Sequence, residues 1–262
     1  MIPAPTRYAR ATDVAHALEL LGEPDAKAIA GGQSLVPVMK LRIARPSLVV
    51  DISRLELREI AVRDDELHIG PLATWADLAG VSHPGLEAIA ECARGIGDLQ
   101  VRNLGTIGGS VVHADPASDM PAVLLALGAR LDVRSPTGSR AIPVEEALVG
   151  PFTTSLGPQE LVTDIVVPLP APGSASAYES VEHPASGFAL VGAAALATSD
   201  AETVALTGVG STPFVLAAGD VRDAIAGAEI FGDRFASEEY RRALAVVVAE
   251  RALARARERR GS

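Results

Sequence analysis

This chain of 262 residues is 48% hydrophobic, 21% charged and 3% aromatic. It is long enough for about two domains and apolar enough to bury a core without disulfides, which excludes wholesale disorder. Its formal net charge of −10 argues against nucleic-acid binding, because such affinity comes largely from neutralising phosphates. No apolar run approaches the ~18 residues of a membrane span, and no signal-peptide core opens the chain, so we expect a cytoplasmic protein without a transmembrane segment.

The few cysteines and histidines limit the possible chemistry. The single cysteine, Cys92, excludes an internal disulfide and any iron–sulfur cluster held by this chain's own thiolates. The five histidines are scattered and form no HxH or HExxH pair, so we predict no metal site. No nucleophile–base pair is evident either, and we assign no catalytic residue.

The N-terminal part of the chain shows helical and strand-like patterns in alternation. Apolar residues at helical spacing predict helices at 12–22, 73–80, 85–96 and 119–128. Strands are expected at 47–52 and 66–70, and a hairpin is expected at 131–143.

Several of these helices carry end signals. Thr74 with Asp77 resembles a capping pair at a helix start. Asp119 is a candidate N-cap, while Gly22 and Gly128 are candidate helix ends.

A change in composition marks the C-terminal part. The segment LPAPGSASA, residues 169–177, predicts a linker between a domain at 1–170 and a domain at 177–262. Beyond it, three strand-like stretches precede two helical stretches near 218–226 and 237–258. This order predicts an α+β module in which helices cover one face of an antiparallel sheet.

The last stretch, RALARARERRGS, is basic. We interpret it as a solvated helix end whose arginines complement the negative end of the helix dipole, in preference to a partner contact.

Two glycine-rich segments stand out, and neither carries a GxGxxG or GxxxxGK[ST] fingerprint, so Rossmann and P-loop interpretations lose their main support. The segments are Ala30, Gly31, Gly32, Gln33 and Ser34, and Thr106, Ile107, Gly108, Gly109 and Ser110. Paired glycines allow positive φ, and turned amides could form an anion nest, with the Ser34 hydroxyl as a further donor. Two such loops could hold a diphosphate; the alternative is two tight turns between strands.

Longer strings around these segments carry a family resemblance. AGGQSLVPVMKLR (30–42) and QVRNLGTIGGSVVHADPASDMPA (100–122) closely resemble the FAD-binding subunit of molybdenum hydroxylases. The nearest likeness is to the medium subunit of carbon-monoxide-dehydrogenase-type enzymes, which is related to the flavin domain of xanthine dehydrogenase. HPASGFALVGAAA (183–195) and LTGVGSTP (206–213) resemble that family's C-terminal domain.

The resemblance implies an α+β fold. A PCMH-type FAD-binding domain of two α+β subdomains would precede a three-stranded antiparallel sheet with helices. It also implies that the FAD diphosphate lies on residues 30–34 and 106–110. Asp119 would contact the flavin or ribityl region, in addition to capping its helix, and Val162 would supply a main-chain contact.

One motif departs from the family pattern. Where relatives often carry AYxKxRHPASGYA, this chain reads AYESVEHPASGFA, so Ser180 stands in place of lysine, Glu182 of arginine and Phe188 of tyrosine. Phe188 can still pack against an isoalloxazine ring but cannot donate a hydrogen bond. Ser180 and Phe188 are therefore further candidate cofactor contacts.

The function that the resemblance implies is electron transfer within a complex. A large partner would hold the molybdopterin-molybdenum centre and a small partner the [2Fe–2S] clusters, in a dimer of heterotrimers. This chain's FAD would pass electrons to NAD⁺, a quinone or another acceptor. The alternatives are a free-standing flavin oxidoreductase of the same fold and a flavin-free assembly subunit, which the missing lysine suggests and the intact glycine segments oppose.

Overall fold

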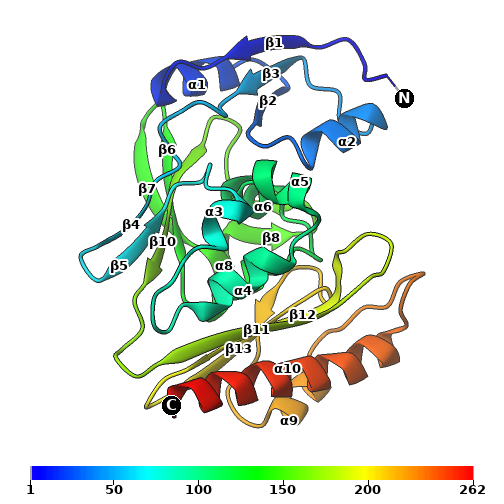
Figure 1. Cartoon of the computed structure of the whole chain (residues 1–262). Helices are drawn as coiled ribbons and strands as arrows, with labels where there is room; N and C mark the ends of the chain where they lie inside the picture. The colour runs from blue at the N-terminus through cyan, green and yellow to red at the C-terminus, as the bar shows by residue number, and fades with distance from the viewer. Residues whose placement is uncertain (1, 262) are drawn as a thin grey trace.

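The computed structural model describes residues 2–261, arranged in three layers that follow the chain order (Figure 1). The first layer is built from β1 (Arg7–Arg10), α1 (Val14–Leu21), β2 (Ala26–Ile29), α2 (Leu35–Lys40) and β3 (Leu48–Asp51). Its three parallel strands stand in the order β1-β3-β2. The helix predicted at 12–22 is confirmed as α1, which Asp13 caps by accepting from the His16 N–H.

The middle layer holds a five-stranded antiparallel sheet in the order β4-β5-β10-β6-β7. Its strands are β4 (Ile60–Arg63), β5 (Glu66–Ile69), β6 (Arg130–Ser135), β7 (Gly138–Pro143) and β10 (Leu161–Pro168). Its helices are α3 (Trp75–Leu78), α4 (Glu87–Gly95), α5 (Leu99–Leu104), α6 (Ile107–His113), α7 (Asp119–Ala126) and α8 (Val144–Ala147). A short pair, β8 (Leu148–Gly150) and β9 (Thr153–Thr154), completes the layer.

The middle layer confirms several predictions and corrects two. Thr74 and Asp77 form the expected capping box at α3, and β6 with β7 forms the expected hairpin. The glycine-rich turn expected at 106–110 is wrong, because residues 107–113 form helix α6. Asp119 is not an N-cap: Ser118 occupies that position, and Asp119 is the first residue of α7.

The third layer consists of β11 (Ala175–Glu182), β12 (Ala189–Ala197), β13 (Glu202–Thr207), β14 (Phe214–Val215), α9 (Val221–Gly227) and α10 (Glu238–Arg260). The antiparallel sheet has a fourth, two-residue strand beyond the three predicted, in the order β11-β12-β13-β14. The last residues of the linker predicted at 169–177 belong to β11. The α+β fold class is otherwise confirmed.

The third layer is not independent of the second. Helix α10 packs along the sheet on one face, while α4 and α7 of the middle layer pack against β11, β12 and β13 (Figure 1). Tyr178, Ala194 and Ala205 of this sheet belong to the same buried cluster as Leu124 and Ile165 of the middle layer. Helices of the middle layer and of the third layer thus both pack against this sheet, whereas the order of elements in the sequence predicted helices on one face only.

The interpretation of the basic C-terminal stretch as a solvated helix end is correct for Arg257 and Arg260, which are exposed in the last turn of α10, but not for the whole stretch. Arg255 and Arg259 of α10 both bind Glu91 of α4, and Arg259 also donates to the carbonyl of Ser176 at 2.8 Å. The stretch therefore joins the third layer to the second.

Candidate functional site

The first glycine segment is a loop with free amides. It follows β2, at the carboxyl end of the parallel sheet, where ligands commonly bind in α/β folds. Gly32 has φ +72°, a left-handed conformation that glycine adopts without steric cost. Within residues 2–261, the N–H groups of Gly31 to Ser34 have no acceptor, and the Ser34 hydroxyl makes no capping bond to α2. The loop therefore presents a row of unused donors, as an anion nest requires.

The second glycine segment is the beginning of a helix with its amides already bonded. Ile107 N–H donates to Ala73 O at 3.0 Å, and Gly108 N–H donates to Pro71 O at 2.9 Å. Gly109 N–H donates to the hydroxyl of Thr106, the N-cap, at 3.3 Å. Any ligand contact here would use the exposed surface of Gly109 rather than free N–H groups.

The structure brings the two segments together. A Cβ on Gly31 would lie 1.7 Å from the carbonyl oxygen of Leu104 and 3.1 Å from the Cα of Gly105, directly before Thr106. The chain can approach this closely only because residue 31 has no side chain. The prediction that residues 30–34 and 106–110 line one site is thus consistent with their packing, although their amides play different roles.

Asp119, at the start of α7, is partly buried. The Tyr178 hydroxyl donates to its Oδ1, and Ser118, one residue earlier, bonds the Ser110 hydroxyl at 2.6 Å. Burial raises the pKa of the Asp119 carboxyl to about 6, and the Tyr178 hydrogen bond partly opposes this. The carboxyl can therefore change protonation near neutral pH.

Three neighbouring side chains belong to the same group. Ser180, two residues after Tyr178 on β11, partly opposes the rise in the pKa of the Tyr178 phenol. Burial raises the pKa of the Cys92 thiol and of the Tyr178 phenol well above their usual values, so both stay neutral. The structure thus groups the candidates Asp119 and Ser180 and connects them, through Ser118, to Ser110 of the second glycine segment.

Two candidates lie outside this group. Phe188 is 47% exposed on the hairpin between β11 and β12, where it lines a cavity of about 340 Å³ with Asp115 and Phe231. Val162 pairs with Val133 in the middle sheet and buries its side chain in the core. The structure does not bring the Val162 side chain to the glycine segments, and its main-chain contact stays a prediction.

The sequence reasoning missed Tyr178. It lies two residues before Ser180 on the same strand, so both side chains point to the same face of the sheet. The signal was this alternation, since a buried tyrosine needs a partner for its hydroxyl.

Residues 4–170 match the family described as the FAD-binding domain in molybdopterin dehydrogenase. The chain belongs to this family.

Relatives and solved structures agree. The chain is 43% identical over 205 residues to the 6-hydroxypseudooxynicotine dehydrogenase complex subunit alpha of Paenarthrobacter nicotinovorans, covering 76% of this chain and 69% of that one. It is 38% identical to the carbon monoxide dehydrogenase medium chain of Hydrogenophaga pseudoflava, covering 81% and 77%. A solved carbon monoxide dehydrogenase from H. pseudoflava, which lacks the Mo-pyranopterin moiety, matches with a TM-score of 0.93, 34% identity and 99% coverage of both chains.

These findings confirm the resemblance stated for the sequence. The chain is an oxidoreductase flavoprotein subunit of the molybdenum hydroxylase type, with the fold of the carbon monoxide dehydrogenase medium chain. In the part of the chain that the structure describes, no helix is both long and apolar enough to span a membrane.

Proposed function

We propose that this chain is the electron-transfer subunit of a cytoplasmic molybdenum hydroxylase complex. Electrons would arrive from [2Fe–2S] clusters on a small partner, after substrate oxidation at a molybdopterin centre on a large partner, in a dimer of heterotrimers. FAD, when bound, would supply the capacity to take up one or two electrons and pass them to NAD⁺, a quinone or another acceptor. The single cysteine supports separate cluster-bearing chains, because this chain cannot ligate the clusters itself.

The observation that carries this proposal is the row of free N–H groups from Gly31 to Ser34. A diphosphate accepts hydrogen bonds and carries negative charge, so a row of unused amides in one loop matches it without any cationic side chain. The Ser34 hydroxyl adds a donor at the same place. In an acidic chain, backbone donors of this kind explain how a dianionic group is held.

The remaining candidate residues have different proposed roles, which depend on where they lie. Gly109 offers an exposed surface beside the first loop, and Ser110 fixes Ser118 at the start of α7. Asp119 and Ser180 would face the flavin side of the cofactor, where a carboxyl with a pKa of about 6 can hold or release a proton. Phe188 would cover an aromatic ring from the hairpin above.

The test is a titration of the full chain with FAD and with FMN, followed by flavin fluorescence. Saturable binding with a preference for FAD is expected, because only FAD carries the diphosphate. Gly32→Ala should weaken FAD binding at least tenfold, because alanine is strained at φ +72° and the loop amides would turn.

The matched control is Gly173→Ala. Its φ is +80°, and a Cβ there would meet nothing within 4 Å, so it imposes the same backbone strain away from the loop. Equal loss of affinity in both variants, or full FAD affinity in Gly32→Ala, would contradict the role of the loop. Copurification of the chain with a cysteine-rich small partner and a large partner then tests the complex.

A further inference from the structure

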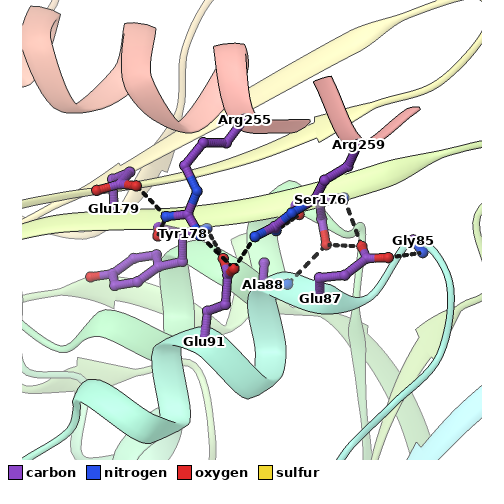
Figure 2. Close-up of polar contacts among 9 residues, drawn as sticks. All are labelled: Gly85, Glu87, Ala88, Glu91, Ser176, Tyr178, Glu179, Arg255 and Arg259. Atoms are coloured by element: carbon purple, nitrogen blue, oxygen red, sulfur yellow. Dashed lines mark hydrogen bonds and ion pairs between the residues drawn. The ribbon is translucent and has the colours of Figure 1, made fainter. Parts of the chain in front are cut away.

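The outer edge of β11 is bonded by side chains instead of by another strand. β11 is the first strand of its sheet, so its outward N–H and carbonyl groups have no strand partner. Two glutamates of α4 accept from them: Glu87 from the Ser176 N–H and Glu91 from the Tyr178 N–H, each at 3.0 Å (Figure 2). Helix α4 therefore fixes this edge at alternate residues, in the period of a strand.

Two arginines of α10 complete the arrangement from the other side. Figure 2 shows Arg255 and Arg259 converging on the same oxygen of Glu91, and the Arg255 contact measures 2.6 Å. Arg255 also donates to the Tyr178 carbonyl at 3.3 Å and to the carboxylate of Glu179. The hydrogen bond to Glu91 raises the pKa of Arg259. Glu91 thus joins α4, β11 and α10.

Tyr178 carries this arrangement into the candidate flavin site. Its N–H and carbonyl are held by Glu91 and Arg255, and its buried ring ends in the hydroxyl that donates to Asp119. The ring has little freedom, since a Cβ on the neighbouring Gly192 would lie 2.3 Å from the same hydroxyl oxygen. The position of the phenol, and with it the bond to Asp119, follows from where the backbone of residue 178 is fixed.

We propose that Glu91, held by Arg255 and Arg259, is a positioning residue for Asp119 and acts through Tyr178. The C-terminal helix thereby sets the protonation of an acid in the candidate flavin site without contacting it. The inference concerns this chain's own residues, and it rests on the proposed function only in giving Asp119 a role towards FAD.

The direction of the effect follows from hydrogen bonding. Burial and two neighbouring carboxylates oppose ionisation of Asp119, while the phenol of Tyr178, which donates to the carboxylate, and the Asp119 backbone N–H favour its ionised form. These carboxylates belong to Glu182 on β11 and Asp115 before α7, and the neutral thiol of Cys92 on α4 also faces Asp119. If the backbone at residue 178 is released, the bond weakens and the pKa of Asp119 rises.

The experiment is a carboxyl carbon NMR titration of Asp119 in the full chain, with the resonance identified by its loss in Asp119→Asn. Tyr178→Phe removes the hydrogen bond and should raise the titration midpoint by roughly one pH unit. Glu91→Gln should move it in the same direction. Arg255→Lys, which keeps the charge but not the forked geometry, should produce a smaller rise.

The matched control is Glu202→Gln, which removes the partner of Arg257, another arginine of α10, at the opposite side of the sheet. Its midpoint should equal that of the wild type. An unchanged midpoint in Glu91→Gln, with an intact far-ultraviolet circular dichroism spectrum, overturns the proposal, as does an unchanged midpoint in Tyr178→Phe. The titration needs no cofactor, so a chain that shows these shifts yet fails to bind FAD supports this inference while contradicting the proposed function.

Discussion

The two glycine segments look alike in sequence and do different things in the structure. In the first, the N–H groups of Gly31 to Ser34 are unused within the described residues. In the second, the amides of residues 107–110 are all bonded to the protein, and the segment is a helix. A glycine pair thus marks either a backbone that is open to a ligand or a backbone that packs tightly, and only an account of the hydrogen bonds separates them.

In each segment, nevertheless, one glycine is required for close packing against another part of the chain. Gly31 admits the carbonyl of Leu104, and Gly108 lies where a Cβ would be 2.4 Å from the Cβ of Pro71. The other glycine of each pair differs: Gly32 takes a left-handed turn, while Gly109 stays helical and exposed. The comparison therefore predicts a separate consequence for each position.

The largest effect is expected for Gly31→Ala. The new Cβ would sit 1.7 Å from a backbone oxygen that cannot move aside, so the two segments must separate. We expect a loss of about 3 kcal/mol or more in the free energy of unfolding, measured with urea, together with loss of FAD binding. The control is Gly227→Ala at the end of α9, where a Cβ meets nothing within 4 Å and stability should not fall. Equal stability of the two variants would show that the segments do not pack as described.

The second largest effect is expected at Asp119. This acid follows the second glycine segment and has no counterpart after the first. Because the folded-state pKa of Asp119 is raised to about 6, its contribution to stability is complete below the unfolded pKa near 4 and is lost as pH rises through 6. Asp119→Asn should abolish this loss and leave the variant more stable than the wild type at pH 8 by up to about 3 kcal/mol. Urea unfolding at pH 5 and pH 8 measures it, and parallel pH profiles for the two proteins would contradict the assignment.

A smaller effect is expected at the cap of the second segment. Thr106→Ala removes the hydroxyl that accepts from Gly109 N–H at the beginning of α6. The variant should lose about 1 kcal/mol of stability, as is usual for an N-cap. Urea unfolding checks this value.

The smallest effect on stability is expected at the corresponding hydroxyl of the first segment. Ser34 makes no capping bond, so Ser34→Ala should change the free energy of unfolding by less than about 0.5 kcal/mol. It should instead weaken FAD binding roughly tenfold, the usual size of a hydrogen bond to a charged group. If Ser34→Ala destabilises the chain as much as Thr106→Ala, the contrast between the segments disappears.

The local parts of the fold were predictable from the sequence. Helix α1, the capping box of Thr74 and Asp77 and the β6–β7 hairpin all follow from spacing and turn chemistry within a few residues. Helix α6 was not predictable in this way, because two glycines lower helix propensity by about 1 kcal/mol each. Its first amides are bonded instead by the carbonyls of Ala73 and Pro71, which lie in another segment.

The candidate site shows the same division between features set by local sequence and features set by distant residues. The segments at 30–34 and 106–110 could be identified by their residues, and the structure places them in contact. The bond between Tyr178 and Asp119 joins residues 59 positions apart, and no local pattern reveals such a pair. The charge run at the C-terminal end favoured solvation, yet its arginines find carboxylates on distant elements.

The contacts of Glu91 also have a consequence for the order in which the site is completed during synthesis. Its partner Arg255 lies 164 positions later in the chain. At a translation rate of about 5–20 residues per second, the interval between the synthesis of Glu91 and that of Arg255 is roughly ten to thirty seconds. Tyr178 is made 77 positions before Arg255, and over that second part of the interval the edge of β11 lacks the arginine bonds and Tyr178 is held from one side only. The surroundings of Asp119 are therefore completed only after both glycine segments have been synthesised.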